Sequence, residues 1–178
     1  LDGSGTVRMS EGEGAFIDSE RLPRPTRDPV DTRIHLQRWT DVGRSPGLSL
    51  RSAWGCPYPC GYCTNSVSAR PYRRRSPASV VDEMEELAYA YDLDRLIFED
   101  ETFLSDSLWL TAFAGELSRR GLRIAFEASG HPAYVEAAVL PLLRDVGLDH
   151  VDLHAASGSS VLLRSLDFSY SPADIYRA

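Results

Sequence analysis

The chain contains no lysine, and all 19 of its basic residues are arginines. We attribute this bias to the codon usage of a GC-rich genome rather than to a chemical requirement. The formal net charge is −7 at pH 7, whereas proteins that bind nucleic acid in bulk present a basic surface. The charge therefore argues against a nucleic-acid partner.

Long apolar segments are also absent. No run reaches the about 18 uncharged apolar residues that a membrane-spanning helix needs, and no basic-then-apolar signal segment stands at the start. The composition, with 43% hydrophobic and 25% charged residues, is typical of a soluble globular protein. We therefore expect no membrane partner and a cytoplasmic location.

Cysteine is scarce, and the three cysteines of the chain are Cys56, Cys60 and Cys63. Three thiolates on one tight loop can ligate three irons of a [4Fe–4S] cluster and leave the fourth iron open. Iron–sulfur proteins of electron transfer normally close the cluster with four cysteines. An open iron therefore indicates an external ligand and a site of chemistry.

Two other uses of these thiols stay open at this point. A disulfide pair with one free thiol would suit a secreted protein, but no secretory feature is present. A structural zinc site needs a fourth ligand, and no matching pair near the loop comes from the four histidines (His35, His131, His150 and His154). We favour the cluster, because the spacing, the lack of other cysteines and Tyr62 inside the last pair agree. Unpaired thiols and an oxygen-labile cluster also fit a reducing cytoplasm.

The texture of the chain changes near residue 48. Residues 1–47 hold few periodic apolar positions and many breakers, so we expect an irregular Pro-rich linker with one short strand near 14–17. The chain opens on Leu1 in a Gly- and Ser-rich stretch and stops at Ala178 inside an expected helix. We expect it to be a piece of a longer polypeptide.

From residue 48 onward, apolar runs alternate with amphipathic segments. Strands are expected at 48–53, 96–98, 122–126 and 150–154. Helices are expected at 76–91, where Ser76 is the N-cap and Pro77 the first residue, at 106–121, at 134–146, after Ser157–Ser159 and at the end of the chain. This alternation predicts an α/β fold with a parallel sheet.

In such a sheet the loops after the strands lie at one edge, where ligands bind. The cysteines follow the first strand, the acids Glu99–Glu101 follow the second, Ser129–His131 the third and Ser157–Ser159 the fourth. The sequence therefore predicts a site above the carboxyl end of the sheet, with the cysteines at one side.

Three segments together resemble the cobalamin-binding branch of the radical S-adenosylmethionine (SAM) superfamily: residues 55–66 around the cysteines, 72–77, and Phe98–Phe103. The resemblance covers roughly residues 20–178. It implies a partial (β/α)6 radical SAM barrel of about four βα units, occupying residues 48–178 and incomplete at the C-terminus. Residues 1–47 would be a linker, or the tail of a preceding B12-binding domain.

The resemblance also implies roles for particular residues. Cys56, Cys60 and Cys63 would bind the [4Fe–4S] cluster, and its open iron would chelate SAM, whose reductive cleavage yields a 5′-deoxyadenosyl radical. Tyr62 would lie beside the cluster or the adenine.

Asp100 and Glu101 would contact the SAM ammonium through charge-assisted hydrogen bonds; the alternative is that they are merely solvated. Glu99 alternates to the opposite side and is a weaker candidate. Ser129 or Glu127 would hold the ribose or the carboxylate of SAM.

The loop after the fourth strand departs from the family pattern, because Ala156 stands where an acid or amide is common. Ser157 and Ser159 could still cradle SAM, although an N-cap role would also explain Ser159. His131 and His154 lie at strand ends and are expected to face the site. Each is either a proton donor or a structural residue. No catalytic residue can be named.

The expected function is reductive SAM cleavage by an iron–sulfur enzyme that is a cobalamin-dependent methyltransferase. The alternatives are a cobalamin-independent radical SAM enzyme of methylthiolation or cyclisation, and an inactive truncated chain that binds a cluster. The implied partners are a small-molecule or natural-product substrate and an electron donor such as flavodoxin or ferredoxin. The basic run Arg70 and Arg73–Arg75 could attract that donor or a substrate anion, or be a solvated loop.

Overall fold

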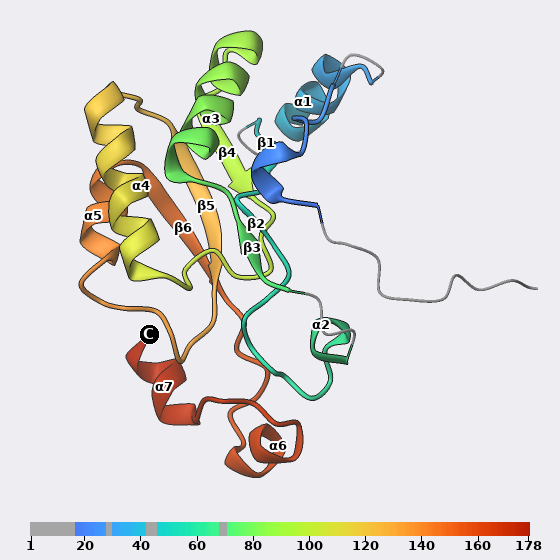
Figure 1. Ribbon diagram of the computed structural model, residues 1–178, viewed down its shortest axis with the longest axis vertical. Coiled ribbons are helices and arrows are strands. Elements are labelled where there is room, and N and C mark those ends of the chain that lie inside the picture. The colour runs from blue at the N-terminus through green and yellow to red at the C-terminus, as the bar shows by residue number, and fades with distance from the viewer. Residues whose placement is uncertain (1–16, 28–29, 42–45, 68–70) are drawn as a thin grey trace, which may run out of the picture.

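The alternating strands and helices form a four-stranded parallel sheet in the order β1-β4-β5-β6 (Figure 1). The computed structural model describes residues 17–27, 30–41, 46–67 and 71–178. The strands are β1 (Leu48–Leu50), β4 (Arg95–Phe98), β5 (Ala125–Gly130) and β6 (Leu148–Leu153). The predicted α/β class, parallel sheet and four βα units are confirmed.

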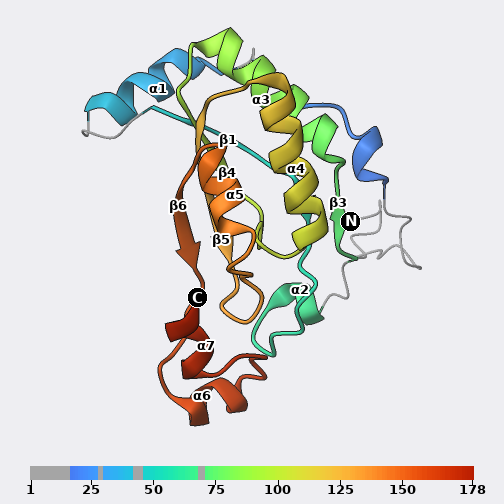
Figure 2. The same ribbon diagram turned by 90° about the vertical axis from the view of Figure 1, so that its left-hand side faces the viewer.

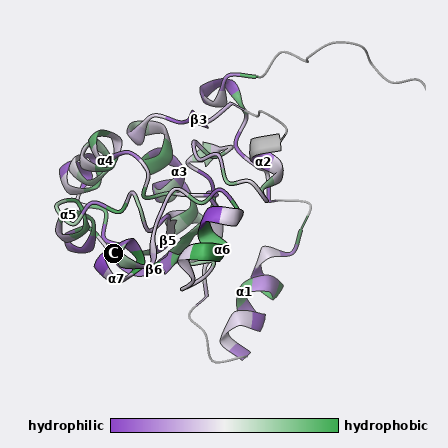
Figure 3. Cartoon of the chain, turned by 90° about the horizontal axis from the view of Figure 1, so that it is seen from below, coloured by the Kyte–Doolittle hydropathy of each residue, from purple (hydrophilic) through white to green (hydrophobic). Residues whose placement is uncertain are grey.

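The main helices lie on one face of this sheet (Figure 2). They are α3 (Pro77–Tyr91), α4 (Ser107–Arg120) and α5 (Leu140–Asp145). Two short helices, α6 (Ser160–Ser165) and α7 (Pro172–Arg177), lie beyond the carboxyl end of the strands (Figures 1 and 3). The other face of the sheet is left for polar side chains.

The two long helices begin and end where the sequence predicts. The Ser76 side chain accepts a hydrogen bond from the Ser79 amide at the start of α3, and Asp106 accepts from the Leu108 and Trp109 amides at the start of α4. These caps satisfy amides that have no partner inside a helix. Gly121, with φ at 67°, ends α4 in the left-handed conformation that glycine adopts without steric cost.

The hydrophobic core lies between the sheet and these helices. Phe98 and Phe126 point from the strands toward Phe113 of α4, with ring centroids 5.8 Å apart in both pairs. Along β4, buried residues alternate with half-buried ones, because successive side chains of a strand point to opposite faces. Leu96 and Phe98 therefore face the helices, and Arg95 and Ile97 face the other way.

Several predicted elements have different bounds; β1 ends at Leu50 rather than at Ala53, and β6 spans Leu148–Leu153 rather than 150–154. β5 begins at Ala125 rather than at Leu122, because the Leu122 amide donates to the Leu117 carbonyl and completes the end of α4. The helix predicted over 134–146 forms only from Leu140, with turns before it. Pro141 fits the first turn of a helix but not its interior, which fixes the start there.

The N-terminal segment is less irregular than predicted. It contains a single 3-10 turn, η1 (Ser19–Arg21), and a ten-residue helix, α1 (Thr32–Asp41). The α1 helix has polar contacts four residues apart, such as Trp39 to His35, and little apolar periodicity, so the hydrophobic pattern gave no indication of it. The strand expected near 14–17 falls almost entirely outside the described residues.

Three short elements lie around the cysteines and were not predicted. β2 (Ala53–Trp54) pairs in antiparallel fashion with β3 (Arg73–Arg74), and α2 (Thr64–Val67) follows the last cysteine. The pairing brings both ends of the intervening segment together and so closes the base of the loop.

Within the described ranges, no helix combines the length and the apolar character needed to span a bilayer.

Candidate functional site

The cysteine loop (residues 55–63) begins directly after β2. Gly55 has a φ of 79°, and a Cβ atom there would lie 2.9 Å from the Pro71 carbonyl oxygen, so the turn requires glycine. The Cys63 amide donates to the Cys60 carbonyl at 3.0 Å and closes a tight turn. The sequence thus folds the three cysteines onto one short loop at the carboxyl end of the sheet.

All three thiols are free; Cys60 is buried, and Cys56 and Cys63 are half-buried. Burial raises the pKa of the Cys56 thiol, and the nearby Cys60 and Cys63 raise it further. The pKa of Cys60 is raised by burial and then by Cys63. Three thiolates so close together repel one another, and a cationic metal centre would stabilise them.

The thiols fit an iron–sulfur cluster as a donor set. Each is free, and Cys60 and Cys63 lie near enough to Cys56 to raise the pKa of its thiol. Over the described ranges, no three His, Cys, Asp or Glu side chains converge on one metal ion. A [4Fe–4S] cluster does not need such convergence, because each of its irons takes a separate thiolate.

Asp100 lies at the end of β4 and is buried. One of its oxygens accepts from the Ser52 amide at 2.8 Å and from the Ala53 amide at 3.2 Å, and the other accepts from the Ser52 hydroxyl. Burial raises the pKa of Asp100, while these hydrogen bonds lower it. The carboxylate that the sequence assigned to SAM therefore ties β4 to the base of the cysteine loop.

Glu101 lies beside the cysteine loop, where its charge contributes to the raised pKa of Cys56. One carboxylate oxygen is 3.2 Å from Nη1 of Arg51. The other oxygen, Oε2, is buried and has no hydrogen-bond partner within the described part of the chain. Glu101 thus offers an unused anionic acceptor next to the thiols.

A cavity of about 360 Å³ lies over the open face of the sheet. Its walls are strongly polar and come from β4, β5 and β6 and the residues just after them: Glu99, Asp100, Glu127, Ser129, His150, Asp152 and His154, with three apolar neighbours. Glu99, the weaker candidate in the sequence, is exposed and lines this cavity. Of the residues predicted to gather at this edge, Glu99, Asp100 and Ser129 line this cavity, whereas the cysteines, Glu101 and Ser157–Ser159 do not.

The serines differ in their surroundings. Ser129 is buried, and its hydroxyl donates to the Asp100 carbonyl at 2.9 Å. The Ser157 hydroxyl accepts from the Ser159 amide at 3.0 Å, and Ser159 caps α6. The Ala156 amide donates to the Tyr170 hydroxyl at 2.8 Å. Tyr170 therefore partners the loop after β6, which the sequence did not indicate.

Aromatic rings join the cysteine loop to its neighbours. Tyr58 stacks on Tyr134, with centroids 4.1 Å apart, and contacts His131 at 4.5 Å. Burial raises the pKa of Tyr58 above its usual range and lowers that of His131. His131 is buried, and its Nε2 atom has no hydrogen-bond partner among the residues described. Tyr62 is 61% exposed and contacts Phe168 at 5.0 Å, so the residue predicted to lie beside a ligand also touches the end of the chain.

The basic run after the loop is not a free basic surface. Arg74 is stacked over Trp109, with Cζ 3.6 Å from the ring centroid, and donates to the Phe103 carbonyl. Arg75 is buried in an ion pair with Glu83. Both the docking role and the solvated-loop alternative are wrong for Arg74 and Arg75, because burial and internal partners occupy them. Arg70 lies outside the described residues.

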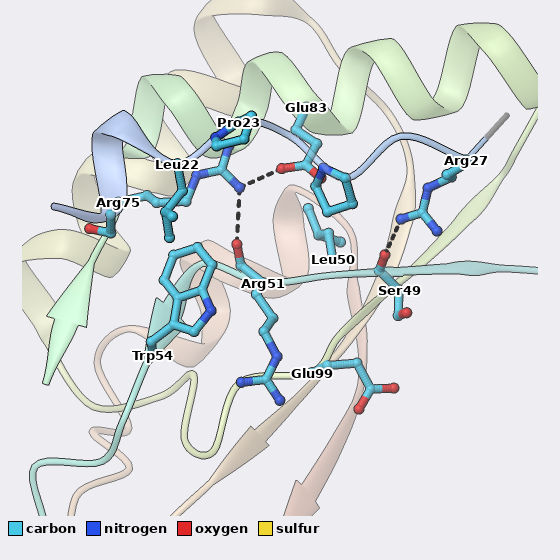
Figure 4. A pocket seen from close by; sticks show the side chains of 12 residues that line it. Leu22, Pro23, Arg27, Ser49, Leu50, Arg51, Trp54, Arg75, Glu83 and Glu99 are labelled. Carbon is cyan, nitrogen blue, oxygen red and sulfur yellow. Dashed lines mark hydrogen bonds and ion pairs between the residues drawn. The ribbon is translucent and has the colours of Figure 1, made fainter. Parts of the chain in front are cut away.

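A second cavity, of about 560 Å³, opens at the edge of β1 (Figure 4). The N-terminal segment forms one wall with Leu22, Pro23 and Pro25, and Arg27 donates to the Ser49 carbonyl across the edge strand. Trp54 and Arg51 contribute from the opposite side. This cavity shares Glu99 with the cavity over the sheet, so the two adjoin.

Comparisons with known proteins agree with this geometry. The family profile described as "Radical SAM superfamily" matches residues 53–178. Anaerobic magnesium-protoporphyrin IX monomethyl ester cyclase of Rubrivivax gelatinosus is 32% identical over 113 residues, which make up 62% of this chain and 20% of that protein.

Two solved structures share the fold. The cobalamin-dependent SAM radical enzyme OxsB, with aqua-cobalamin and SAM bound, has a TM-score of 0.76 and 18% identity over 98% of this chain and 26% of its own. The radical SAM methyltransferase TsrM from Kitasatospora setae, with cobalamin and a [4Fe–4S] cluster bound, has a TM-score of 0.63 and 22% identity over 91% of this chain and 32% of its own. The chain thus spans between 20% and 32% of the length of these three proteins.

Proposed function

This chain belongs to the radical SAM superfamily, and we propose that Cys56, Cys60 and Cys63 hold a [4Fe–4S] cluster whose fourth iron is open to SAM. The observation that carries this proposal is the placement of three free thiols on one short loop beside an unpaired carboxylate oxygen. When bound, such a cluster supplies the electron that splits the SAM sulfonium into methionine and a 5′-deoxyadenosyl radical.

The protein's own part is to bind and orient SAM. We assign the SAM ammonium to Glu101, because its Oε2 is buried and unused and Arg51 fixes the other oxygen. A carboxylate and an ammonium form a charge-assisted hydrogen bond, which is stronger in a partly buried place than in water. Asp100 supports this site indirectly, since its oxygens hold the base of the cysteine loop.

The serines and Tyr62 have narrower roles in this proposal. The Ser157 hydroxyl accepts one hydrogen bond and keeps its own hydrogen for a SAM carboxylate or ribose oxygen. Ser129 donates to Asp100 and keeps acceptor capacity toward the cavity it lines. Tyr62 covers the outer side of the cysteine loop.

For the complete protein we propose cobalamin-dependent methyl transfer to a small-molecule or natural-product substrate. The support is the fold shared with OxsB and TsrM, which extends over nearly the whole chain in the first case. One electron would come from a donor protein such as flavodoxin or ferredoxin. Cyclisation is the second candidate, because the relative from Rubrivivax gelatinosus is a cyclase.

The test is anaerobic reconstitution of the full-length protein with iron and sulfide, followed by a dithionite-driven assay for 5′-deoxyadenosine. We expect bound iron and this product in the wild type, and neither in a variant with all three cysteines changed to alanine. Failure to take up iron would refute the cluster assignment. A protein with a cluster but without product would refute SAM cleavage.

A second measurement separates the two outcomes for the complete protein. With SAM carrying an isotope-labelled methyl group, a methyltransferase moves the label to the substrate, whereas a cyclase forms product without it. Added cobalamin should stimulate label transfer. A labelled product that forms equally well without cobalamin would refute the cobalamin proposal.

A further inference from the structure

A segment far along the chain contacts the cysteine loop directly. The Gly61 amide, between the second and third cysteines, donates to the Leu166 carbonyl at 3.0 Å. Leu166 follows α6 and belongs to the fourth βα unit, whereas the cysteine loop belongs to the first. This hydrogen bond joins the two segments through backbone atoms alone.

The approach is so close that a side chain at position 61 would be crowded. A Cβ atom at Gly61 would lie 2.9 Å from Asp167 Oδ2, 3.1 Å from the Leu166 carbonyl oxygen and 3.2 Å from Asp167 Cβ. Its backbone conformation does not itself demand glycine, since its φ lies outside the left-handed region. The neighbouring segment therefore favours glycine here, and a side chain would push the two apart.

The segment itself is a well-defined turn. Asp167 has a φ of 53°, and its amide donates to the Arg164 carbonyl while the Phe168 amide donates to the Leu163 carbonyl at 2.9 Å. Leu163 is buried, which anchors the turn. This left-handed ending of α6 leaves the Leu166 carbonyl free to accept from Gly61.

Two rings extend the contact. Phe168 packs on Tyr62 of the cysteine loop with centroids 5.0 Å apart, and on Tyr170 at 5.1 Å. The Tyr170 hydroxyl donates to the His154 carbonyl at 3.1 Å and accepts from the Ala156 amide. The same segment therefore touches both the cysteine loop and the loop after β6.

We propose that Leu166, Asp167 and Phe168 form a clasp that positions the cysteine loop, and that Gly61 is the residue that allows the clasp to close. They are positioning residues and touch the loop, not the reacting atoms. The proposal rests on the proposed function only for what the loop holds; the clasp itself is a property of the chain without metal.

The test compares four forms of the full-length protein: wild type, Gly61→Ala, Asp167→Gly and the double variant. Asp167→Gly removes the two side-chain atoms nearest to a Cβ at position 61 and suits a positive φ. The rate of amide hydrogen exchange at residues 60–63 is measured in the metal-free protein. The rate of iron loss to a chelator is measured after reconstitution. Gly61→Ala should speed both by about fivefold or more, the effect of one lost net hydrogen bond on a local opening.

In the double variant we expect both rates to return to within about twofold of Asp167→Gly alone, since the main clash is gone. Gly115→Ala is the matched control, because nothing lies within 4 Å of a Cβ there, and it should match the wild type. Unchanged rates in Gly61→Ala, or no recovery in the double variant, would overturn the clasp.

A substitute variant and the metal-free measurement distinguish failure of the clasp proposal from misfolding and from failure of the proposed function. If Gly61→Ala loses its circular-dichroism melting transition, Phe168→Ala replaces it, since that change removes the ring contact without adding an atom; unchanged exchange at residues 60–63 then refutes the clasp. If the wild type takes up no iron, the proposed function fails, while the exchange comparison still decides whether the clasp exists.

Discussion

Replacing Asp100 by alanine should strongly destabilise the fold at the base of the cysteine loop. The carboxylate accepts from the Ser52 and Ala53 amides and from the Ser52 hydroxyl. Ser52 and Ala53 are 0% and 1% exposed, so water does not reach the amides. A buried donor without a partner costs about 1–3 kcal/mol. Two such amides give about 2–6 kcal/mol, and we expect a loss near ~4 kcal/mol in the free energy of unfolding.

The matched variant is Asp100→Asn, which keeps one carbonyl oxygen for the two amides. It replaces charge-assisted hydrogen bonds by neutral ones, and we expect it to cost only about 1–2 kcal/mol. Both values come from urea unfolding of the metal-free protein followed by circular dichroism, with the slope m compared among variants. A loss below about 1 kcal/mol for Asp100→Ala, or equal losses for both variants, would refute the role of Asp100 as the acceptor for these amides.

Three other predictions concern different parts of the molecule. Glu83→Gln leaves the buried Arg75 charge without its partner and should cost about 3–5 kcal/mol in urea unfolding; a loss below about 1 kcal/mol would contradict the buried pair. Glu101→Gln should weaken SAM binding about tenfold, measured by titrating the reduced cluster's paramagnetic resonance signal, and an unchanged affinity would remove Glu101 from the SAM site. The pKa of Glu116 is lowered to about 2 by hydrogen bonds from the two arginines that follow it in α4. The contribution of Glu116 to the free energy of unfolding is therefore present above its unfolded-state pKa and is lost as the pH falls toward about 2. Glu116→Gln should flatten the fall in the urea midpoint between pH of about 5 and about 3, and an unaltered fall would contradict this.

The strong local patterns predicted much of this architecture. Ser76 followed by Pro77 marks a helix start whatever the tertiary context, and the cysteine spacing defines a loop by itself. The gathering of loop residues at the carboxyl end of the sheet follows from right-handed crossovers between parallel strands. These parts of the fold and site depend on neighbours in sequence or on general topology.

The partners of individual side chains could not be predicted in the same way. Asp100 looks like a free acid in the sequence, but its acceptor atoms are used by Ser52 and Ala53, which lie 48 and 47 positions earlier. Arg74 looks like part of a basic patch and is instead stacked on Trp109. Tyr170 carries no motif, yet it holds the loop after β6. Contacts of this kind depend on the distance between elements after folding, which residue type and spacing do not encode.

The alternation along β4, β5 and β6 also separates what keeps this protein folded from what it can act on. Parallel strands usually carry apolar residues on both faces because helices cover both. Here Leu96, Phe98 and Phe126 face the helices, while Glu99 and Glu127 line the cavity on the opposite side. A mutation at an exposed cavity position such as Glu99 changes the chemical lining of the cavity and leaves the interior packing intact, whereas Asp100, which also lines the cavity, is tied into the fold. Substitutions at such exposed positions therefore change what the cavity can bind at little cost to the stability that the helix-covered face provides.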